Sequence, residues 1–149
     1  MDTITYNTAL IVGAGVGLSA ALTRLLTFKG IRVALAARGT DKLAALCKET
    51  GAIAYPCDAT DLNDLTRLFT DVERDCDAPD VVVYNASARV RGAFVDLTPA
   101  DVAKAIAVSA FGGFLVAQQA SRRMLPNRHG AIVFTGTPDG HRTRGVALA

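Results

Sequence analysis

A glycine-rich segment near the N-terminus is the strongest sign of chemistry in this sequence. Gly13, Gly15 and Gly17 follow an apolar run and precede an amphipathic segment. Such a turn lets the backbone approach a pyrophosphate, and the amides at the start of the helix, around Val16 and Leu18, then point towards its charge. Leu18 stands where the strict G-x-G-x-x-G pattern has its last glycine, so a tight turn that binds nothing is the alternative.

The end of the second apolar run, residues 31–36, indicates which nucleotide would bind. NAD-binding units usually place an acid there, about 20 residues past the glycine loop, to bond the ribose 2′-hydroxyl. This run is followed by Ala37 and Arg38 instead. Because the planar guanidinium suits phosphate oxygens, Arg38 favours NADP over NAD and argues against an S-adenosylmethionine site. An ordinary surface arginine is the alternative.

The elements that must position these residues alternate regularly along the chain. Short apolar runs predict strands, and amphipathic segments predict helices, the long one capped by Thr98 with Pro99 in its first turn. This alternation predicts a doubly wound parallel α/β sheet with helices on both faces, in one domain spanning residues 1–149. The expected strands are 8–12, 31–36, 52–56, 81–84 and 131–135, and the expected helices are 16–29, 40–51, 61–75 and 99–124.

Some details of the helices are also predicted. Leu18, Leu22, Leu25 and Leu26 would form the buried stripe of the first helix, and Thr40 would cap the second. The Gly112-Gly113 pair in the long helix suits close helix packing, although glycine lowers helix stability.

Composition sets further expectations. The net charge is +2 with no run of like charges, so no nucleic-acid or membrane partner is expected. The apolar runs are strand-sized and interrupted by glycine, which predicts no transmembrane helix, and the N-terminus shows no secretory signal. The three cysteines are widely spaced, which predicts no metal site and favours a reducing, cytoplasmic location.

Three segments resemble motifs of the short-chain dehydrogenase/reductase family, over a match from Ala9 to the end of the chain. VGAGVGLS is similar to its T-G-x-x-x-G-x-G loop, with Gly13 and Gly17 matching. CDAT resembles its D-V/A-T segment, and YNAS resembles its N-N-A-G motif, with Asn85 and Ala86 matching. The resemblance implies the strand order 3-2-1-4-5. It also implies that Asp58 and the amide of Ala59 bond adenine, although both Asp58 and Asn85 could instead be structural turn residues.

The family's reaction is hydride transfer between the nicotinamide and a carbonyl or alcohol carbon, and it uses a tyrosine with a lysine four residues later. No tyrosine of this chain has that partner. The resemblance puts Ser109 at the position of the helical asparagine, where it is better read as a packing residue than as a relay member. It puts Thr137 at the position of the catalytic serine, with Thr135 as a weaker alternative.

Two consequences follow from the resemblance. The chain is expected to be a truncated, catalytically incompetent form that lacks the C-terminal part of the family fold, so its substrate is not readable. The fifth strand would then be an exposed edge, and the helix 99–124 could pair two copies. The alternatives are a non-catalytic NADP(H)-binding or sensing protein, and a remnant that acts only through protein contacts.

Overall fold

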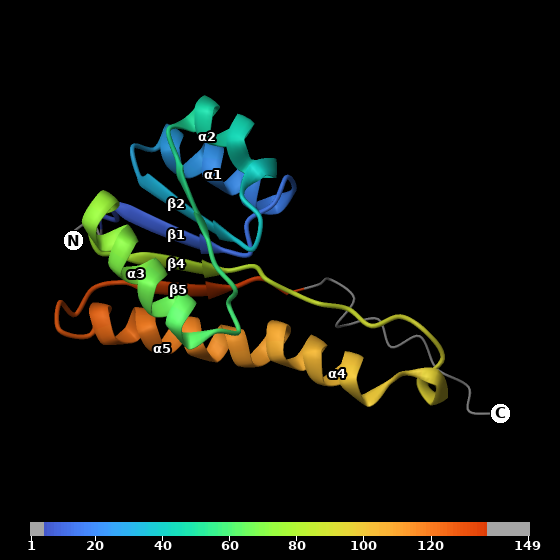
Figure 1. The fold of residues 1–149 in the computed structure, drawn as a ribbon. Coiled ribbons are helices and arrows are strands. Elements are labelled where there is room, and N and C mark those ends of the chain that lie inside the picture. Colours follow the sequence, from blue (N-terminus) through green and yellow to red (C-terminus); the bar gives the residue numbers. More distant parts are fainter. Residues whose placement is uncertain (1–4, 137–149) are drawn as a thin grey trace.

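The computed structural model describes residues 5–136, and they form a parallel five-stranded sheet in the order β3-β2-β1-β4-β5 (Figure 1). The predicted order and fold class are therefore confirmed. Val12 pairs with Ala36 on one side and with Tyr84 on the other, so three strands end level with one another. The strands are β1 (Thr8–Val12), β2 (Arg32–Ala37), β3 (Ile53–Pro56), β4 (Val81–Tyr84) and β5 (Ala131–Phe134).

Helices cover both faces of the sheet (Figure 1). Helices α1 and α2 pack on one face, and α3 and α5 pack on the other. The helices are α1 (Leu18–Phe28), α2 (Ala44–Thr50), α3 (Leu62–Cys76), α4 (Pro99–Ile106) and α5 (Gly112–Met124), with 3₁₀ turns at Asp41–Leu43 and Phe94–Asp96 and a π-turn at Ala107–Phe111.

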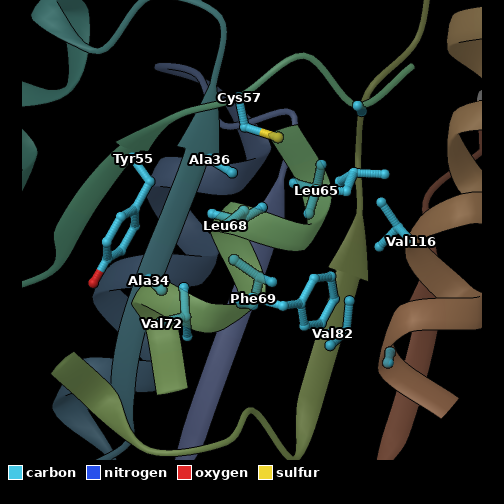
Figure 2. Close-up of a cluster of buried hydrophobic side chains, with 14 of the residues drawn as sticks. Ala34, Ala36, Tyr55, Cys57, Leu65, Leu68, Phe69, Val72, Val82 and Val116 are labelled. Atoms are coloured by element: carbon cyan, nitrogen blue, oxygen red, sulfur yellow. The ribbon is translucent and has the colours of Figure 1, made fainter. Parts of the chain in front are cut away.

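The alternation of side chains along the strands divides the core into two layers. Leu10 and Val12 of β1 point to the α3/α5 layer, whereas Ile11 points to the α1/α2 layer. Figure 2 shows the first layer, in which Phe69 of α3 lies over the sheet. Val116 of α5 and Phe69 are both fully buried. The α3/α5 layer is thus closely packed against the centre of the sheet.

Helix α1 approaches the sheet through smaller side chains than the sequence suggested. Ser19, Ala20 and Thr23 are the buried residues of this helix, while Leu18 is 61% exposed and Leu25 is 50% exposed. The prediction of a leucine stripe was wrong, although Leu22 and Leu26 pack partly against the core. The residues that face the sheet most closely therefore have smaller side chains than leucine.

The boundaries of α2 differ at one end from those expected. Thr40 precedes a 3₁₀ turn and its side chain makes no capping hydrogen bond, so the predicted cap was wrong. The other end is as expected, since α2 stops at Gly51, whose φ of 75° lies in the left-handed region.

The long helix begins as predicted and is then interrupted. The Thr98 hydroxyl accepts a hydrogen bond from the Asp101 amide at 3.2 Å. Helices α4 and α5 and the π-turn between them run through Pro99–Met124 for 26 residues, long and apolar enough to cross a membrane by length and composition alone. This corrects the expectation that no apolar segment exceeds a strand in length. Part of that apolar character has a packing cause, since Leu115 and Val116 are buried against the sheet.

Strand β5 lies at an edge of the described sheet, as expected. Its Val133 and Phe134 are 47% and 57% exposed. The edge strand therefore presents apolar side chains as well as backbone groups.

Candidate functional site

A cleft of about 660 Å³ lies at the carboxyl ends of the strands. In open parallel sheets, ligands bind in the crevice where the strand order reverses, and here β1 separates β2 from β4 at that point. The cleft is lined by Val12, Gly13, Ala14, Ala37, Arg38, Gly39, Lys42, Cys57, Asp58, Ala59, Thr60, Asn85, Ala86, Ser87 and Val108.

Most of the residues singled out from the sequence meet in this cleft, but the start of α1 stands apart. Gly15, Val16, Gly17 and Leu18 do not line the cleft, and Val16 is 79% exposed at the start of α1. Thr137 lies outside the described residues. The predicted residues that line the cleft are Gly13, Arg38, Asp58, Ala59, Asn85 and Ala86.

Gly13 is held in a position that no other residue can occupy without strain. Its φ is 86°, and a Cβ built on it would lie 2.7 Å from the carbonyl carbon of Asn85. The amides of Gly13 and Ala14 both donate to the Ala36 carbonyl, each at 2.9 Å. The turn after β1 is therefore clamped between the ends of β2 and β4.

Gly15 and Gly17 differ from Gly13 in their surroundings. A Cβ at either position would have no heavy atom within 4 Å, so close packing does not require glycine there. The Gly15 amide donates to Ser19 Oγ at 2.7 Å, and that hydroxyl donates back to the Gly15 carbonyl at 3.0 Å. The loop is thus braced internally while the space in front of it is open.

Two cationic side chains flank the cleft beside the end of β2. Arg38 follows the strand directly, and Lys42 stands on the next 3₁₀ turn. Both are exposed, and within residues 5–136 neither forms an ion pair. Lys42 was not predicted from the sequence, because nothing in its local pattern distinguishes it from a solvent-exposed lysine.

Asp58 shapes the loop after β3. Its carboxylate accepts hydrogen bonds from the Thr60 hydroxyl at 2.7 Å and the Thr60 amide at 2.9 Å. These bonds lower the pKa of Asp58, and the positive charges of Arg38 and Lys104 lower it further. Its own amide donates to Asp64 at 2.9 Å. The residue therefore has the turn-forming role foreseen as an alternative, and its carboxylate is ionised beside the cleft at neutral pH.

The other groups of this loop are not nucleophiles. Burial raises the pKa of the Cys57 thiol to about 12, and the charges of Asp64 and Asp58 add to the shift. The cap of α3 is Asp61, whose carboxylate accepts from the Asn63 and Asp64 amides. Cys57 is therefore a neutral wall of the cleft.

Asn85 connects three strands at the floor of the cleft. Its amide donates to the Val12 carbonyl at 2.7 Å, and its Nδ2 donates to the Gly13 carbonyl at 3.1 Å. Its Oδ1 accepts from the Thr135 hydroxyl at 2.8 Å. This pattern fits the structural alternative for Asn85, and it engages the hydroxyl of Thr135 as well.

Ser109 lies on the π-turn and forms hydrogen bonds with the loop after β4. Its hydroxyl accepts from the Ala88 amide at 3.0 Å and donates to the Ala88 carbonyl at 3.2 Å. The hydroxyl is thus engaged on both sides, which is the behaviour of a positioning residue.

The arrangement is suited to binding rather than to covalent chemistry. It offers two cations, an ionised carboxylate, the backbone of Gly13 and Ala14, and an apolar wall around one cleft. No cluster of three or more histidine, cysteine or acidic residues able to hold a metal occurs among residues 5–136.

Comparison with known proteins agrees with this geometry. The family model for short chain dehydrogenase matches residues 7–148. The chain is 31% identical over 134 residues to the 3-oxoacyl-[acyl-carrier-protein] reductase MabA of Mycobacterium tuberculosis, covering 90% of this chain and 52% of that protein. It is 29% identical over 150 residues to the cyclic-di-GMP-binding biofilm dispersal mediator protein of Escherichia coli, covering 100% of this chain and 61% of that protein.

A solved structure gives the same picture. An actinorhodin polyketide ketoreductase, determined with NADPH, superposes with a TM-score of 0.87 at 27% identity, covering 95% of this chain and 57% of that one. The chain thus spans little more than half the length of the relatives it matches.

Proposed function

The chain belongs to the short-chain dehydrogenase/reductase family, and on this basis we propose that its cleft is the NADP(H)-binding part of an oxidoreductase that acts on a carbonyl or alcohol substrate. Relatives in this family, such as the ketoreductase determined with NADPH, suggest binding of a nicotinamide dinucleotide. The observation that carries the choice of NADP is the pair of unpaired cations, Arg38 and Lys42, at the end of β2, where NAD-binding units have an acid.

The cleft fits such a ligand in size and shape. Its volume of about 660 Å³ lies within the range of about 300–1,000 Å³ typical of ligand sites. The open space at Gly15 and Gly17 leaves room for a pyrophosphate against the backbone. Helix α1 has no acidic residue in its first turn, so its positive dipole end is available to the phosphate charge.

Each wall would hold a different part of the dinucleotide. Arg38 and Lys42 would bind the 2′-phosphate of the adenosine ribose, and Asp58 with the amide of Ala59 would bind the adenine. Asn85 and Ala86 would form the floor beneath the ribose and pyrophosphate. When bound, the dinucleotide supplies the hydride-transferring ring.

The 149 residues lack a tyrosine followed by a lysine four residues later, and we propose that they bind the cofactor without turning over a carbonyl substrate. Thr137 remains the candidate for positioning a substrate oxygen. A non-catalytic NADP(H)-binding or sensing protein would use the same cleft. A turnover assay with mixed carbonyl substrates tests the lack of turnover, since sustained NADPH consumption that depends on Thr137 would contradict it.

Binding of the cofactor is the first experiment. The chain contains no tryptophan, so NADPH fluorescence is read without energy transfer from indole. We expect NADPH to bind saturably. We expect the dissociation constant of NADH to be about 10-fold higher or more, because NADH lacks the 2′-phosphate that forms charge-assisted bonds. Absence of saturable binding for both would refute the nucleotide site. Equal affinities would refute only the preference for NADP.

A second proposal concerns the partner of the long helix. Phe111 and Phe114 stack with ring centroids 6.2 Å apart, and they are 52% and 56% exposed. Exposed apolar surface of this kind marks an interaction site. We propose that a second copy of the chain covers it, since the edge strand β5 adds the exposed Phe134 beside the same helix.

We expect a dimer in sedimentation velocity, and a monomer for Phe114→Glu, because a buried unpaired carboxylate opposes association. Phe28→Glu is the matched control, since Phe28 is 89% exposed on α1 over the other face of the sheet. A monomeric wild-type chain, or a Phe114→Glu variant that stays dimeric, would contradict the proposal.

A further inference from the structure

The long helix changes its hydrogen-bond pattern beside the cleft. Between α4 and α5, residues Ala107–Phe111 form a π-turn, closed by a bond from the Gly112 amide to the Ala107 carbonyl. Such turns are rare and occur often at functional sites. Here the turn brings Val108 to the wall of the cleft and Ser109 to the loop after β4. The π-turn is therefore a part of the ligand site.

One side chain from the sheet reaches this turn. Tyr84 ends β4, is 3% exposed, and donates its hydroxyl hydrogen bond to the Val108 carbonyl. Because the donor comes from the sheet, the bond ties the irregular turn to the most rigid part of the fold.

Tyr84 also fixes how closely the helix approaches. A Cβ at Gly112 would collide with the Tyr84 hydroxyl and lie 3.0 Å from the Ala59 carbonyl oxygen, and one at Gly113 would lie 3.3 Å from the tyrosine ring. The glycine pair therefore allows the close helix packing that was expected, here against the Tyr84 and Phe134 rings of the sheet. The hydroxyl stands where the sheet, the π-turn and the loop carrying Ala59 meet.

We infer that Tyr84 is a positioning residue that holds the π-turn, and with it Val108, as the wall of the adenosine half of the cleft. The inference rests on the proposed nucleotide site, because the adenine is expected beside Asp58 and Ala59. Burial, followed by the negative charge of Asp58, raises the pKa of Tyr84 to about 12. The hydroxyl consequently stays protonated and able to donate throughout the neutral range.

The test removes only the hydroxyl. In Tyr84→Phe the ring still fills its place, but the Val108 carbonyl loses its donor. We expect the dissociation constants of NADPH and of 2′,5′-ADP to rise together by about 3- to 10-fold, the range of one hydrogen bond. Both ligands contain the adenosine half of the dinucleotide. An equal loss of affinity for the two would therefore place the effect in the adenosine half of the cleft.

Tyr55→Phe is the matched control. Tyr55 is also a buried tyrosine, and its hydroxyl bonds Asp75 at 3.0 Å. The cleft lies at the Cys57 end of β3. Figure 2 shows the Tyr55 hydroxyl directed away from that end. We expect Tyr55→Phe to lose stability without losing affinity for either ligand. Unchanged affinity in Tyr84→Phe, or an equal loss in both variants, would overturn the inference.

Amide exchange gives a readout that needs no ligand. We expect exchange across residues 105–114 to accelerate several-fold in Tyr84→Phe and to stay unchanged in Tyr55→Phe, because only the first releases the π-turn. Failure of the wild-type chain to bind either ligand would refute the proposed nucleotide site. Unchanged exchange in Tyr84→Phe would refute the positioning role by itself.

Discussion

Gly13→Ala is expected to lower the free energy of unfolding by about 3–5 kcal/mol, which is a large share of the roughly 5–15 kcal/mol of a typical domain. Two costs add. The φ of 86° is unfavourable for alanine, and the new methyl group would press on the backbone of Asn85 and Ala86. Those atoms follow β4 directly and are held by the bond from the Asn85 amide to the Val12 carbonyl, so they cannot move without disturbing the end of the sheet. Urea unfolding followed by far-ultraviolet circular dichroism measures the loss.

Gly15→Ala is the matched control for this change. A methyl group there meets no atom within 4 Å, and no positive φ is imposed on it. We expect its stability to stay within about 0.5 kcal/mol of the wild type. We also expect it to bind NADPH about 10-fold or more weakly, because the methyl group would enter the space assigned to the pyrophosphate. Equal stability of the two variants would contradict the role given to Gly13.

The elements that could be predicted from the sequence are those whose pattern arises locally. The β-branched run VVVY predicts a strand buried on both faces, and β4 occupies that run. The strand order was inferred from family motifs at the strand ends rather than from any strand. In α1 the pattern failed for Leu18 and Leu25, because the face that packs against the sheet is not the most apolar one. Small residues such as Ala20 and Thr23 were then buried in place of Leu25.

The π-turn shows what such patterns cannot contain. Residues 107–111 have an ordinary helical composition, and the hydrogen bond that reaches this break comes from Tyr84, more than twenty positions earlier. The same applies to Gly112, whose lack of a side chain has meaning only beside that hydroxyl. These features arise when distant segments meet, so periodicity carries no trace of them.

The lining residues of the cleft were predicted from the sequence when they directly follow a strand. They were not predicted when they lie on a later turn. Gly13, Arg38, Asp58 and Asn85 follow strands directly and converge at the carboxyl edge of the sheet. Lys42 lies one turn further on, and it reaches the cleft because the chain folds back over the end of β2. A lysine four residues after Arg38 looks like any solvent-exposed helix residue until that turn is placed.

Removal of both cations should abolish the preference for NADPH. We expect Arg38→Ala to weaken NADPH binding by about 10- to 100-fold, the loss of a charged hydrogen bond worth about 1.5–3 kcal/mol. Lys42→Ala should cost roughly 3- to 10-fold, because a flexible ammonium binds phosphate as a point charge. The double variant should bind NADPH no better than NADH, whose affinity changes by less than about 2-fold since it lacks the 2′-phosphate. Isothermal titration calorimetry measures the affinities of the wild type, the two single variants and the double variant for NADPH and for NADH.

Salt dependence distinguishes a phosphate contact from a general loss of structure. The wild-type affinity for NADPH should fall as ionic strength rises, since exposed charges are screened beyond about 10 Å at 0.1 M salt. The double variant should lose most of that dependence. Lys48→Ala is the matched control, because Lys48 is an exposed lysine of α2 that does not line the cleft. If the double variant still preferred NADPH, the phosphate would have to bind elsewhere, and the assignment of the adenosine half to the end of β2 would fail with it.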